Sequence, residues 1–189
     1  PCIDVNTNPN NPIIGERAFA NNPNDVIKGM EIFVQESRKQ NVIPCVKHFP
    51  GHGDADKDSH LDLPQIDLCL DEMENIHIKP FKKAIENNIE MIMAAHLHCT
   101  CFDKNIIPAS LSKNAIGYLR NRLNYNGVII SDDMFMKGVK DYSSLEAVIK
   151  GIEAGLDMFI FRESDSNTLE MIEKLVKIVE KDKGMLQGT

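Results

Sequence analysis

The sequence has no tryptophan, and aromatic residues make up only 6% of its 189 residues. Basic residues are also in the minority, because 21 lysines and arginines stand against 28 aspartates and glutamates, for a net charge of −7. A chain with this charge repels phosphate backbones and anionic lipids, so no nucleic-acid or membrane-surface partner is expected. No apolar run approaches the roughly 20 residues of a transmembrane helix, so no transmembrane segment is predicted.

The sequence also lacks any cysteine pattern typical of a metal site or a disulfide framework. Its cysteines are odd in number and irregularly spaced, at Cys2, Cys45, Cys69, Cys99 and Cys101. We expect reduced thiols, which favour a cytoplasmic location. A secreted or anchored form stays open, because the sequence opens with proline rather than methionine and no signal peptide is recognisable.

Short apolar runs, each followed by polar residues, are predicted to be strands. They span 1–5, 42–46, 90–95, 127–130 and 156–161. Helical patterns separate them, an order that predicts an α/β protein with parallel strands and a single domain over residues 1–189. Barrels and open sheets both place ligand sites at the carboxyl ends of such strands, so the pattern does not choose between them.

The helices that follow these strands have recognisable start signals. Asp25 is expected to cap the first long helix, and Pro80 fits the first residue of another. Ser112 and Ser143 are expected N-caps of two more helices. The last helix is expected over about 167–180, with these apolar residues facing inward: Ile172, Leu175, Val176 and Val179.

The most polar stretch of the chain, Lys47-His48-Phe49-Pro50-Gly51-His52-Gly53-Asp54-Ala55-Asp56-Lys57-Asp58-Ser59-His60, follows the second strand. It is too polar for a core, and such loops carry the chemistry of α/β proteins. Its alternating aspartates resemble the first half of a calcium loop, but Ser59 and Gln65 stand where that loop needs Gly and Glu. A metal-dependent hydrolase using residues 48–60 is an alternative, and the prediction is that no metal binds.

Residues 47–60 resemble the signature of family 3 glycoside hydrolases of the β-N-acetylglucosaminidase type. Segments 4–19, 108–112 (Pro-Ala-Ser-Leu-Ser) and 127–138 (Gly-Val-Ile-Ile-Ser-Asp-Asp-Met-Phe-Met-Lys-Gly) resemble further segments of that family, in the same order. The resemblance implies a (β/α)8 TIM-barrel type of fold. Only about five strand–helix units are present where a closed barrel has eight.

The resemblance implies that Asp132 is the catalytic nucleophile and His60, held by Asp58, the acid/base. A carboxylate beneath the anomeric carbon forms a covalent glycosyl-enzyme, which water cleaves with retention of configuration. An imidazole, with an ordinary pKa of about 6.5, donates a proton in the first step and accepts one in the second. Read without the resemblance, Asp132 is a helix cap and Asp58 with His60 is a chance pair on a surface loop.

Three further residues match sugar-binding positions of the family: Arg17, Lys47 and His48. The plainer interpretation of Lys47 and Arg17 is as solvated charges or as partners of Asp4. Asp133 fits an N-cap better than a catalytic group, and His52 is expected to shape the loop through its ring hydrogen bonds. Histidines 96 and 98 are interpreted as structural.

The resemblance implies a retaining exo-β-N-acetylglucosaminidase that needs no cofactor. Its substrates would be N-acetylglucosaminides, specifically peptidoglycan fragments or muropeptides, in bacterial cell-wall recycling. The acceptor would be water, with phosphate as the alternative. Besides the metal-dependent hydrolase, a non-catalytic truncated remnant stays open as an alternative.

Overall fold

A computed structural model describes residues 1–55 and 63–181. Its central feature is a parallel sheet with the strand order β1-β3-β5-β6, which confirms the α/β class. A separate pair, β2 with β4, is also parallel. The strands are β1 (Cys45–Phe49), β2 (Gln65–Ile66), β3 (Met91–Ala94), β4 (His98–Cys99), β5 (Val128–Asp133) and β6 (Met158–Ile160).

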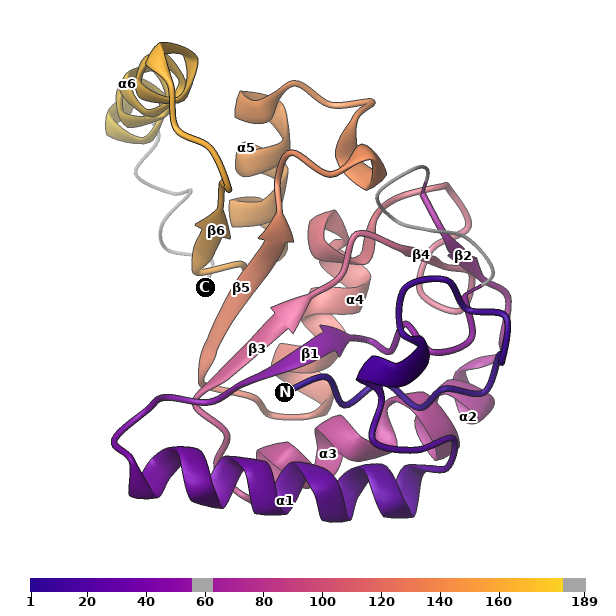
Figure 1. The fold of residues 1–189 in the computed structure, drawn as a ribbon. Helices are drawn as coiled ribbons and strands as arrows, with labels where there is room; N and C mark the ends of the chain where they lie inside the picture. The colour runs from indigo at the N-terminus through magenta and orange to yellow at the C-terminus, as the bar shows by residue number, and fades with distance from the viewer. Residues whose placement is uncertain (56–62, 182–189) are drawn as a thin grey trace.

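Helices follow the strands of the sheet and pack beside them. In Figure 1, α1 and α3 run below the sheet while α4 and α5 lie behind it. Within the described residues, every helix is too short or too polar to span a membrane. The helices are α1 (Pro23–Lys39), α2 (Leu70–Glu72), α3 (Lys79–Glu86), α4 (Lys113–Gly117), α5 (Ser144–Ala154) and α6 (Ser166–Lys181), with π-helical turns at Met73–His77 and Tyr118–Arg122 and 3-10 turns at Gly15–Arg17, Ala109–Leu111 and Lys137–Val139.

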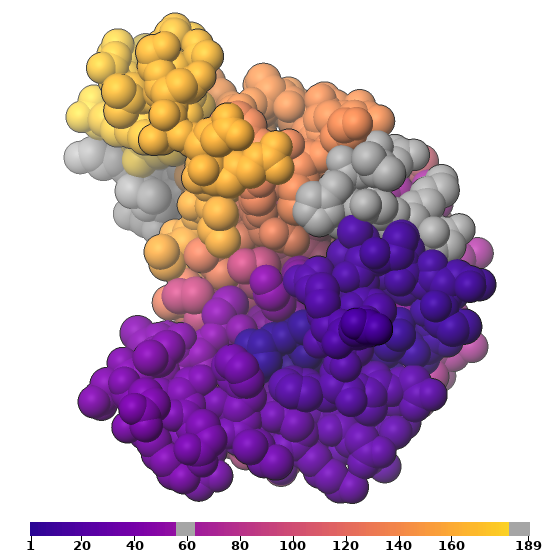
Figure 2. Space-filling view, in the orientation of Figure 1, coloured from indigo at the N-terminus to yellow at the C-terminus, as the bar shows by residue number. Residues whose placement is uncertain are grey.

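The two faces of the sheet differ in burial. On one face, Val46, Ile92 and Ile129 have no exposed surface and join the core with α1, α3 and the chain around Ile116. On the other face the alternate residues are half-buried, except Ile130 at 8% exposure; the half-buried ones are Cys45, Lys47, Met91, Met93, Val128 and Asp132. The second set follows the side-chain alternation of a strand, so the sheet has one covered face and one open face. Figure 2 shows this side of the molecule hollowed between the indigo N-terminal part and the orange part after β5.

The strand register brings the carboxyl ends of the strands into one row. Phe49 of β1 pairs with Ala94 of β3, and Ala94 pairs with Ser131 of β5. At the next step Asp133 pairs with Ile160 of β6. The loop that follows Phe49 and the Asp132 carboxylate therefore lie at the same edge of the sheet.

The second strand begins later than the sequence predicts. Val42 and Ile43 are 57% and 67% exposed and lie outside β1. The cause is the end of α1, where Asn41 takes a left-handed φ of 56° and the Val42 N–H donates to the Ser37 carbonyl. Residues 41 and 42 therefore form the C-terminal cap of α1, and strand pairing with β3 starts only at Cys45.

The first apolar run lies beside β1 but pairs only briefly. Cys2 bridges to Lys47 in parallel, with the Ile3 N–H donating to the Lys47 carbonyl at 2.7 Å and the Lys47 N–H donating to the Pro1 carbonyl at 3.1 Å. This contact places the residues after Val5 next to the loop that follows β1.

Two of the predicted helix caps are confirmed. The Ser112 side chain accepts from the Ala115 N–H, and the Ser143 side chain accepts from the Glu146 N–H. The cap of α1 is Asn22 rather than Asp25, because Pro23 already fits the first helical position and the Asp25 N–H donates to the Asn22 side chain.

The predicted inward face of the last helix is wrong in part. Met171 is its buried residue and Leu175 packs partly against α5, whereas Ile172 and Val176 are 47% and 49% exposed. Residues 171 and 175 lie one helical turn apart, and only that stripe meets the α5 side of the protein.

Candidate active site

The centre of the candidate site is the carboxylate of Asp4, which has no exposed surface. Its Oδ2 accepts from His48 Nδ1 at 2.7 Å and from the Cys2 thiol at 3.0 Å. Its Oδ1 accepts from the backbone N–H of His52 at 2.6 Å, and the His48 N–H lies 3.2 Å from both oxygens. The peptide bond before His48 is cis. Asp4 thus joins the N-terminal segment to both ends of the turn that follows β1.

Burial alone would raise the pKa of the Asp4 carboxyl. Its interactions with His48 and His52 and the hydrogen bond from Cys2 outweigh burial and hold this pKa well below the usual range. Burial and the Asp4 charge raise the pKa of the Cys2 thiol to about 12. Asp4 is therefore the charged acceptor of this cluster, and the thiol is its donor.

Arg17 contacts the same histidine from the outside. Its Nη2 lies 3.4 Å from His48 Nε2, and its side chain is exposed. An arginine only donates, so Nε2 accepts and Nδ1 carries the proton that goes to Asp4. Arg17 does not pair with Asp4, because His48 takes that position, but its exposed side chain fits the other plain interpretation, a solvated charge.

Lys47 and Asp132 belong to the open face of the sheet. Cys45, Met91 and Val128 pair in register and therefore point to one side, and Lys47 and Asp132 continue the alternation on their strands. Burial raises the pKa of the Cys45 thiol, and the Lys47 and Asp132 charges modify it in opposite directions. Both charged groups are therefore close enough to influence Cys45 and lie on the same face of the sheet.

Asp133 is the last residue of β5 and not the predicted N-cap, since Met136 precedes the next 3-10 turn, but its side chain does have a structural role. Its Oδ1 accepts from the N–H groups of Phe135 at 3.1 Å and Arg162 at 3.3 Å, and its Oδ2 lies 3.3 Å from the Arg162 guanidinium. It ties the end of β5 to the end of β6. Asp132 has no such bonds to a neighbouring strand among the described residues; its Oδ1 accepts from the adjacent Asp133 N–H.

His96 links the chain next to Asp132 to Ser110 through hydrogen bonds of its ring. Its Nδ1 lies 2.6 Å from Ser110 Oγ, and its Nε2 lies 3.2 Å from the Asp133 carbonyl oxygen. A carbonyl only accepts, so Nε2 carries the proton and Ser110 donates to Nδ1. Burial lowers the pKa of His96, opposed by the nearby Asp132 charge, so the ring is a neutral link between the strands.

His52 does not shape the loop through its ring, contrary to the sequence prediction. Neither of its buried ring nitrogens has a hydrogen-bond partner within the described residues. Burial lowers its pKa, and Asp4 raises it less strongly. The loop is held by its backbone instead: the Asn11 side chain donates to the His52 carbonyl at 2.8 Å, and a Cβ on Gly53 would lie 1.8 Å from the Val5 carbonyl oxygen.

The predicted acid/base pair, Asp58 and His60, lies outside the described residues. The described part of the proposed calcium loop does not favour a metal, because Asp54 accepts from the Thr7 hydroxyl at 2.7 Å. The structure brings Arg17, His48 and Asp4 into contact and places Lys47 with Asp132 on one face. Sequence reasoning missed Asp4 and Ser110 as site residues, although both stand inside segments that carry the resemblance.

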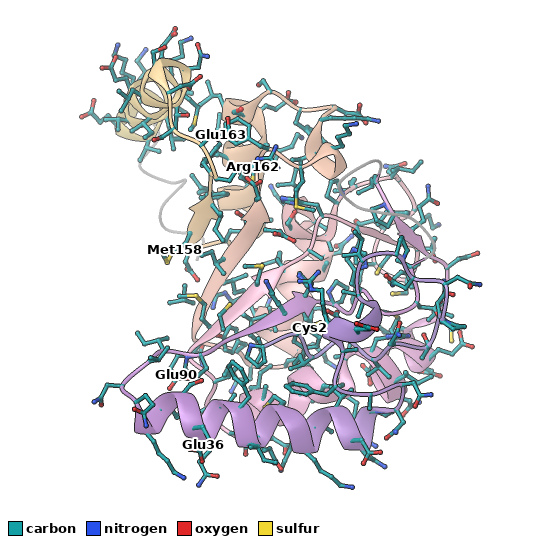
Figure 3. All side chains as sticks on the ribbon, in the orientation of Figure 1. Cys2, Glu36, Glu90, Met158, Arg162 and Glu163 are labelled. Carbon is teal, nitrogen blue, oxygen red and sulfur yellow. The ribbon has the colours of Figure 1, made fainter. Side chains whose placement is uncertain are left out.

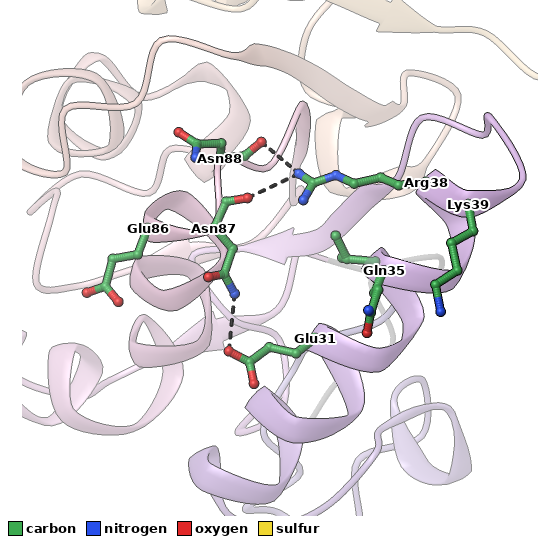
Figure 4. Close-up of a pocket in the computed structure, with 8 residues that line it drawn as sticks. Glu31, Gln35, Arg38, Lys39, Glu86, Asn87 and Asn88 are labelled. Carbon is green, nitrogen blue, oxygen red and sulfur yellow. Dashed lines mark hydrogen bonds between the residues drawn. The ribbon is translucent and has the colours of Figure 1, made fainter.

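A hollow of about 750 Å³ lies at the other end of the sheet, between the C-terminal ends of α1 and α3. In Figure 4, Arg38 donates to the carbonyls of Asn87 and Asn88 there, and the Asn87 amide donates to Glu31. These bonds satisfy the last carbonyls of α3 before β3 begins. In barrels, the amino ends of the strands serve stability rather than chemistry, so we assign this hollow no part in the site.

Comparison with known proteins agrees with this fold. A β-hexosaminidase A of Pseudoalteromonas piscicida is 36% identical over 171 residues, which are 84% of this chain and 29% of that protein. A family 3 β-N-acetylglucosaminidase of Paenibacillus sp. FPU-7 superposes with a TM-score of 0.94 at 30% identity, over 100% of this chain and 37% of that one. The β-glucoside phosphorylase BglX superposes with a TM-score of 0.88 at 30% identity, over 98% of this chain and 35% of that one.

The chain therefore spans about a third of the length of these three relatives. The partial α/β fold with parallel strands agrees with a barrel-type domain of which only some units are present. Residues 1–187 match the model of the glycosyl hydrolase family 3 N-terminal domain, and the chain belongs to that family.

Proposed function

We propose that this chain carries part of the active site of a retaining exo-β-N-acetylglucosaminidase. Asp132 is the nucleophile, His60 oriented by Asp58 is the acid/base, and Arg17, Lys47 and His48 bind the sugar. The substrates are terminal β-linked N-acetylglucosaminides of peptidoglycan or muropeptide fragments, processed in the bacterial cytoplasm. No cofactor takes part.

The observation that carries the proposal is the shared position of Lys47 and Asp132 on the open face, at the carboxyl edge of the sheet. His48 and Arg17 border the same edge, so donors for sugar hydroxyls stand beside a carboxylate that accepts few bonds itself. A nucleophile needs a free oxygen, and sugar recognition needs directed donors. The names of the relatives favour N-acetylglucosaminides over other sugars.

The nucleophile is tested by Asp132→Asn in the protein at its full natural length. We expect turnover to be abolished, together with covalent labelling by a 2-fluoro N-acetylglucosaminide analogue, because an amide does not attack the anomeric carbon. Asp141→Asn is the control, since Asp141 is an exposed aspartate after the same strand. Full labelling of the Asp132→Asn protein would exclude this role.

The acid/base is tested by comparing leaving groups. In a His60→Ala variant, natural disaccharides are expected to slow far more than nitrophenyl glycosides, whose leaving group needs little protonation. Asp58→Asn should show the same preference more weakly, because Asp58 acts on His60 alone. Equal slowing of both substrate types would rule out the acid role of His60.

Phosphate is the second candidate acceptor, and the similarity to BglX favours testing it. A neutral imidazole repels an incoming phosphate less than a carboxylate acid/base does. Adding inorganic phosphate would then yield N-acetylglucosamine 1-phosphate in place of the free sugar. Free sugar alone, at every phosphate concentration, would leave water as the acceptor.

A further inference from the structure

Three different metal-ligand types meet beside the candidate site. The Cys2 Sγ, an Asp4 carboxylate oxygen and a His48 ring nitrogen all lie within 4.8 Å of one another. Asp4 and His48 are almost fully buried, and Cys2 is partly buried. Figure 3 places Cys2 beside β1 on the open side of the sheet. Within residues 1–55 and 63–181, this is the group of three His, Cys or acidic side chains whose ligand atoms lie close enough for one ion.

The hydrogen bonds within the group converge on a single atom. Both the thiol and the imidazole Nδ1 give their protons to Asp4 Oδ2, at 3.0 Å and 2.7 Å. The two protons lie on separate lines, one between Sγ and Oδ2 and the other between Nδ1 and Oδ2, and the three ligand atoms lie within 4.8 Å of one another. A cation bound between these atoms would replace both protons with bonds to the same three atoms.

The dimensions suit a small thiophilic cation. A tetrahedral zinc ion with bonds of about 2.0–2.3 Å holds its donor atoms roughly 3.3–3.7 Å apart. The two short contacts would therefore lengthen by roughly half an ångström, which side-chain rotation at Cys2 and His48 supplies. The main chain holds Asp4 in place through the N–H groups of His48 and His52, so the central ligand is already oriented.

We propose that Cys2, Asp4 and His48 form a binding site for a thiophilic divalent cation of the zinc and cadmium type. Thiolate and imidazole are the ligands such ions prefer, and one carboxylate completes a three-ligand set with an open fourth position for water. On binding, the Cys2 thiol releases its proton to solvent, and the His48 proton moves from Nδ1 to Nε2. No electron is transferred.

Binding of a cation at this site would change the contact between His48 and Arg17. Once Nε2 of His48 carries a proton, it no longer accepts from Arg17, which now lies 3.4 Å away. The exposed Arg17 side chain then turns to solvent. The metal site shares His48 with the proposed sugar-binding residues, so an ion there is expected to weaken sugar binding, although neither Asp132 nor the acid/base pair is a ligand.

The test is a titration of the whole chain with Cd²⁺ alone, in a buffer with a non-chelating reductant. Binding to a thiolate is followed by the ultraviolet sulfur-to-cadmium charge-transfer band. We expect the band to saturate at one equivalent in the unchanged protein and to be lost in Cys2→Ser. Cys45→Ser is the matched control, a partly buried cysteine on the adjacent strand that stays outside the site, and it should keep the band.

A second variant tests whether loss of the cadmium band results from removal of the thiol or from unfolding of the protein. Cys2→Val keeps an apolar side chain of similar size, and its circular dichroism spectrum should match that of the unchanged protein while the band is absent. The proposal is overturned if the unchanged protein gives no band, if Cys2→Ser keeps it, or if Cys45→Ser alone removes it. Because the readout is spectroscopic, none of these results depends on glycosidase activity.

Discussion

At the scale of single residues, Asp4 has the strongest influence on the site. It is a fully buried carboxylate that holds His48 by the ring and His52 by the backbone. The loop after β1 therefore takes its position from a residue more than 40 positions away in the sequence. A change at Asp4 should disturb stability and sugar binding together.

Asp4 should also make stability depend on pH in acid. Its pKa in the folded protein lies below that of an unfolded aspartate, about 3.9. Its stabilising contribution is therefore complete above about pH 4 and is lost as the pH falls toward the folded pKa. We expect the free energy of unfolding in urea to fall more steeply below pH 4 in the unchanged protein than in Asp4→Asn.

At pH 7 the Asp4→Asn variant should be less stable by about 2 kcal/mol, since charge-assisted hydrogen bonds become neutral ones. Asp141→Asn, an exposed aspartate, serves as the control and should follow the unchanged protein at every pH. Parallel curves for the unchanged protein and Asp4→Asn between pH 5 and pH 3 would contradict a depressed pKa at Asp4.

His96 is predicted to be a positioning residue for Asp132. It holds the carbonyl of the next residue and is itself held by Ser110. His96→Ala should lower kcat by about 100-fold, because a small displacement of a reacting group is costly. KM should change little, since the His96 side chain is buried and its two ring nitrogens are taken by Ser110 and the Asp133 carbonyl.

The conservative variant separates positioning from general destabilisation. His96→Gln places an amide donor near the former Nε2 and should recover part of kcat, whereas Ser110→Ala should lower it modestly. Both are measured on nitrophenyl N-acetylglucosaminide with the full-length protein. A rise in KM at unchanged kcat would show that His96 acts on substrate binding instead.

At the scale of elements, features set by adjacent residues could be predicted from the sequence. Features set by contacts with distant segments could not. Ser112 and Ser143 cap their helices as expected, because a cap depends on a few adjacent residues. The start of β1 was misplaced because the left-handed turn at Asn41 took Val42 into the helix end. The exposed Ile172 depends on which neighbours α6 meets, which its own sequence does not contain.

The same division applies to the candidate site. The residues named from the resemblance, such as Lys47 and Asp132, lie together because strand ends gather at one edge. The partners of His48 and His96 could not be predicted, since Asp4 and Ser110 reach them only after the chain has folded. Hydrogen-bond networks between distant segments leave no periodic signal in the sequence.

Ser143 allows a direct test of an element's contribution. Its side chain accepts from the Glu146 N–H at the start of α5, which packs against the chain around β5. Ser143→Ala should lower the free energy of unfolding by about 1 kcal/mol, the usual cost of a lost N-cap. Ser144→Ala is the matched control, because Ser144 is exposed and is the first residue of the helix itself. Equal effects of the two variants would contradict the capping role.

At the scale of the whole molecule, the open face of the sheet is the decisive feature. Half-buried residues cover that face, from Cys45 on β1 to Asp132 on β5. The sheet ends on one side at β6, whose Met158 is 46% exposed, and on the other at the briefly paired run before Val5. In a closed barrel, by contrast, the corresponding side chains fill the interior.

This openness predicts low activity for residues 1–189 by themselves. Asp132 is only half-buried, so solvent screens its charge and the donors around it are not held in a preorganised, enclosed site. We expect turnover of nitrophenyl N-acetylglucosaminide to be at least about 100-fold below that of the Paenibacillus relative under the same conditions, since misplaced reacting groups alone cost that much. The chain covers 37% of that relative's length. Circular dichroism must show that the chain is folded in the assay. Turnover close to that of the relative, by a folded chain, would mean that an open sheet with Lys47, His48 and Asp132 suffices for catalysis.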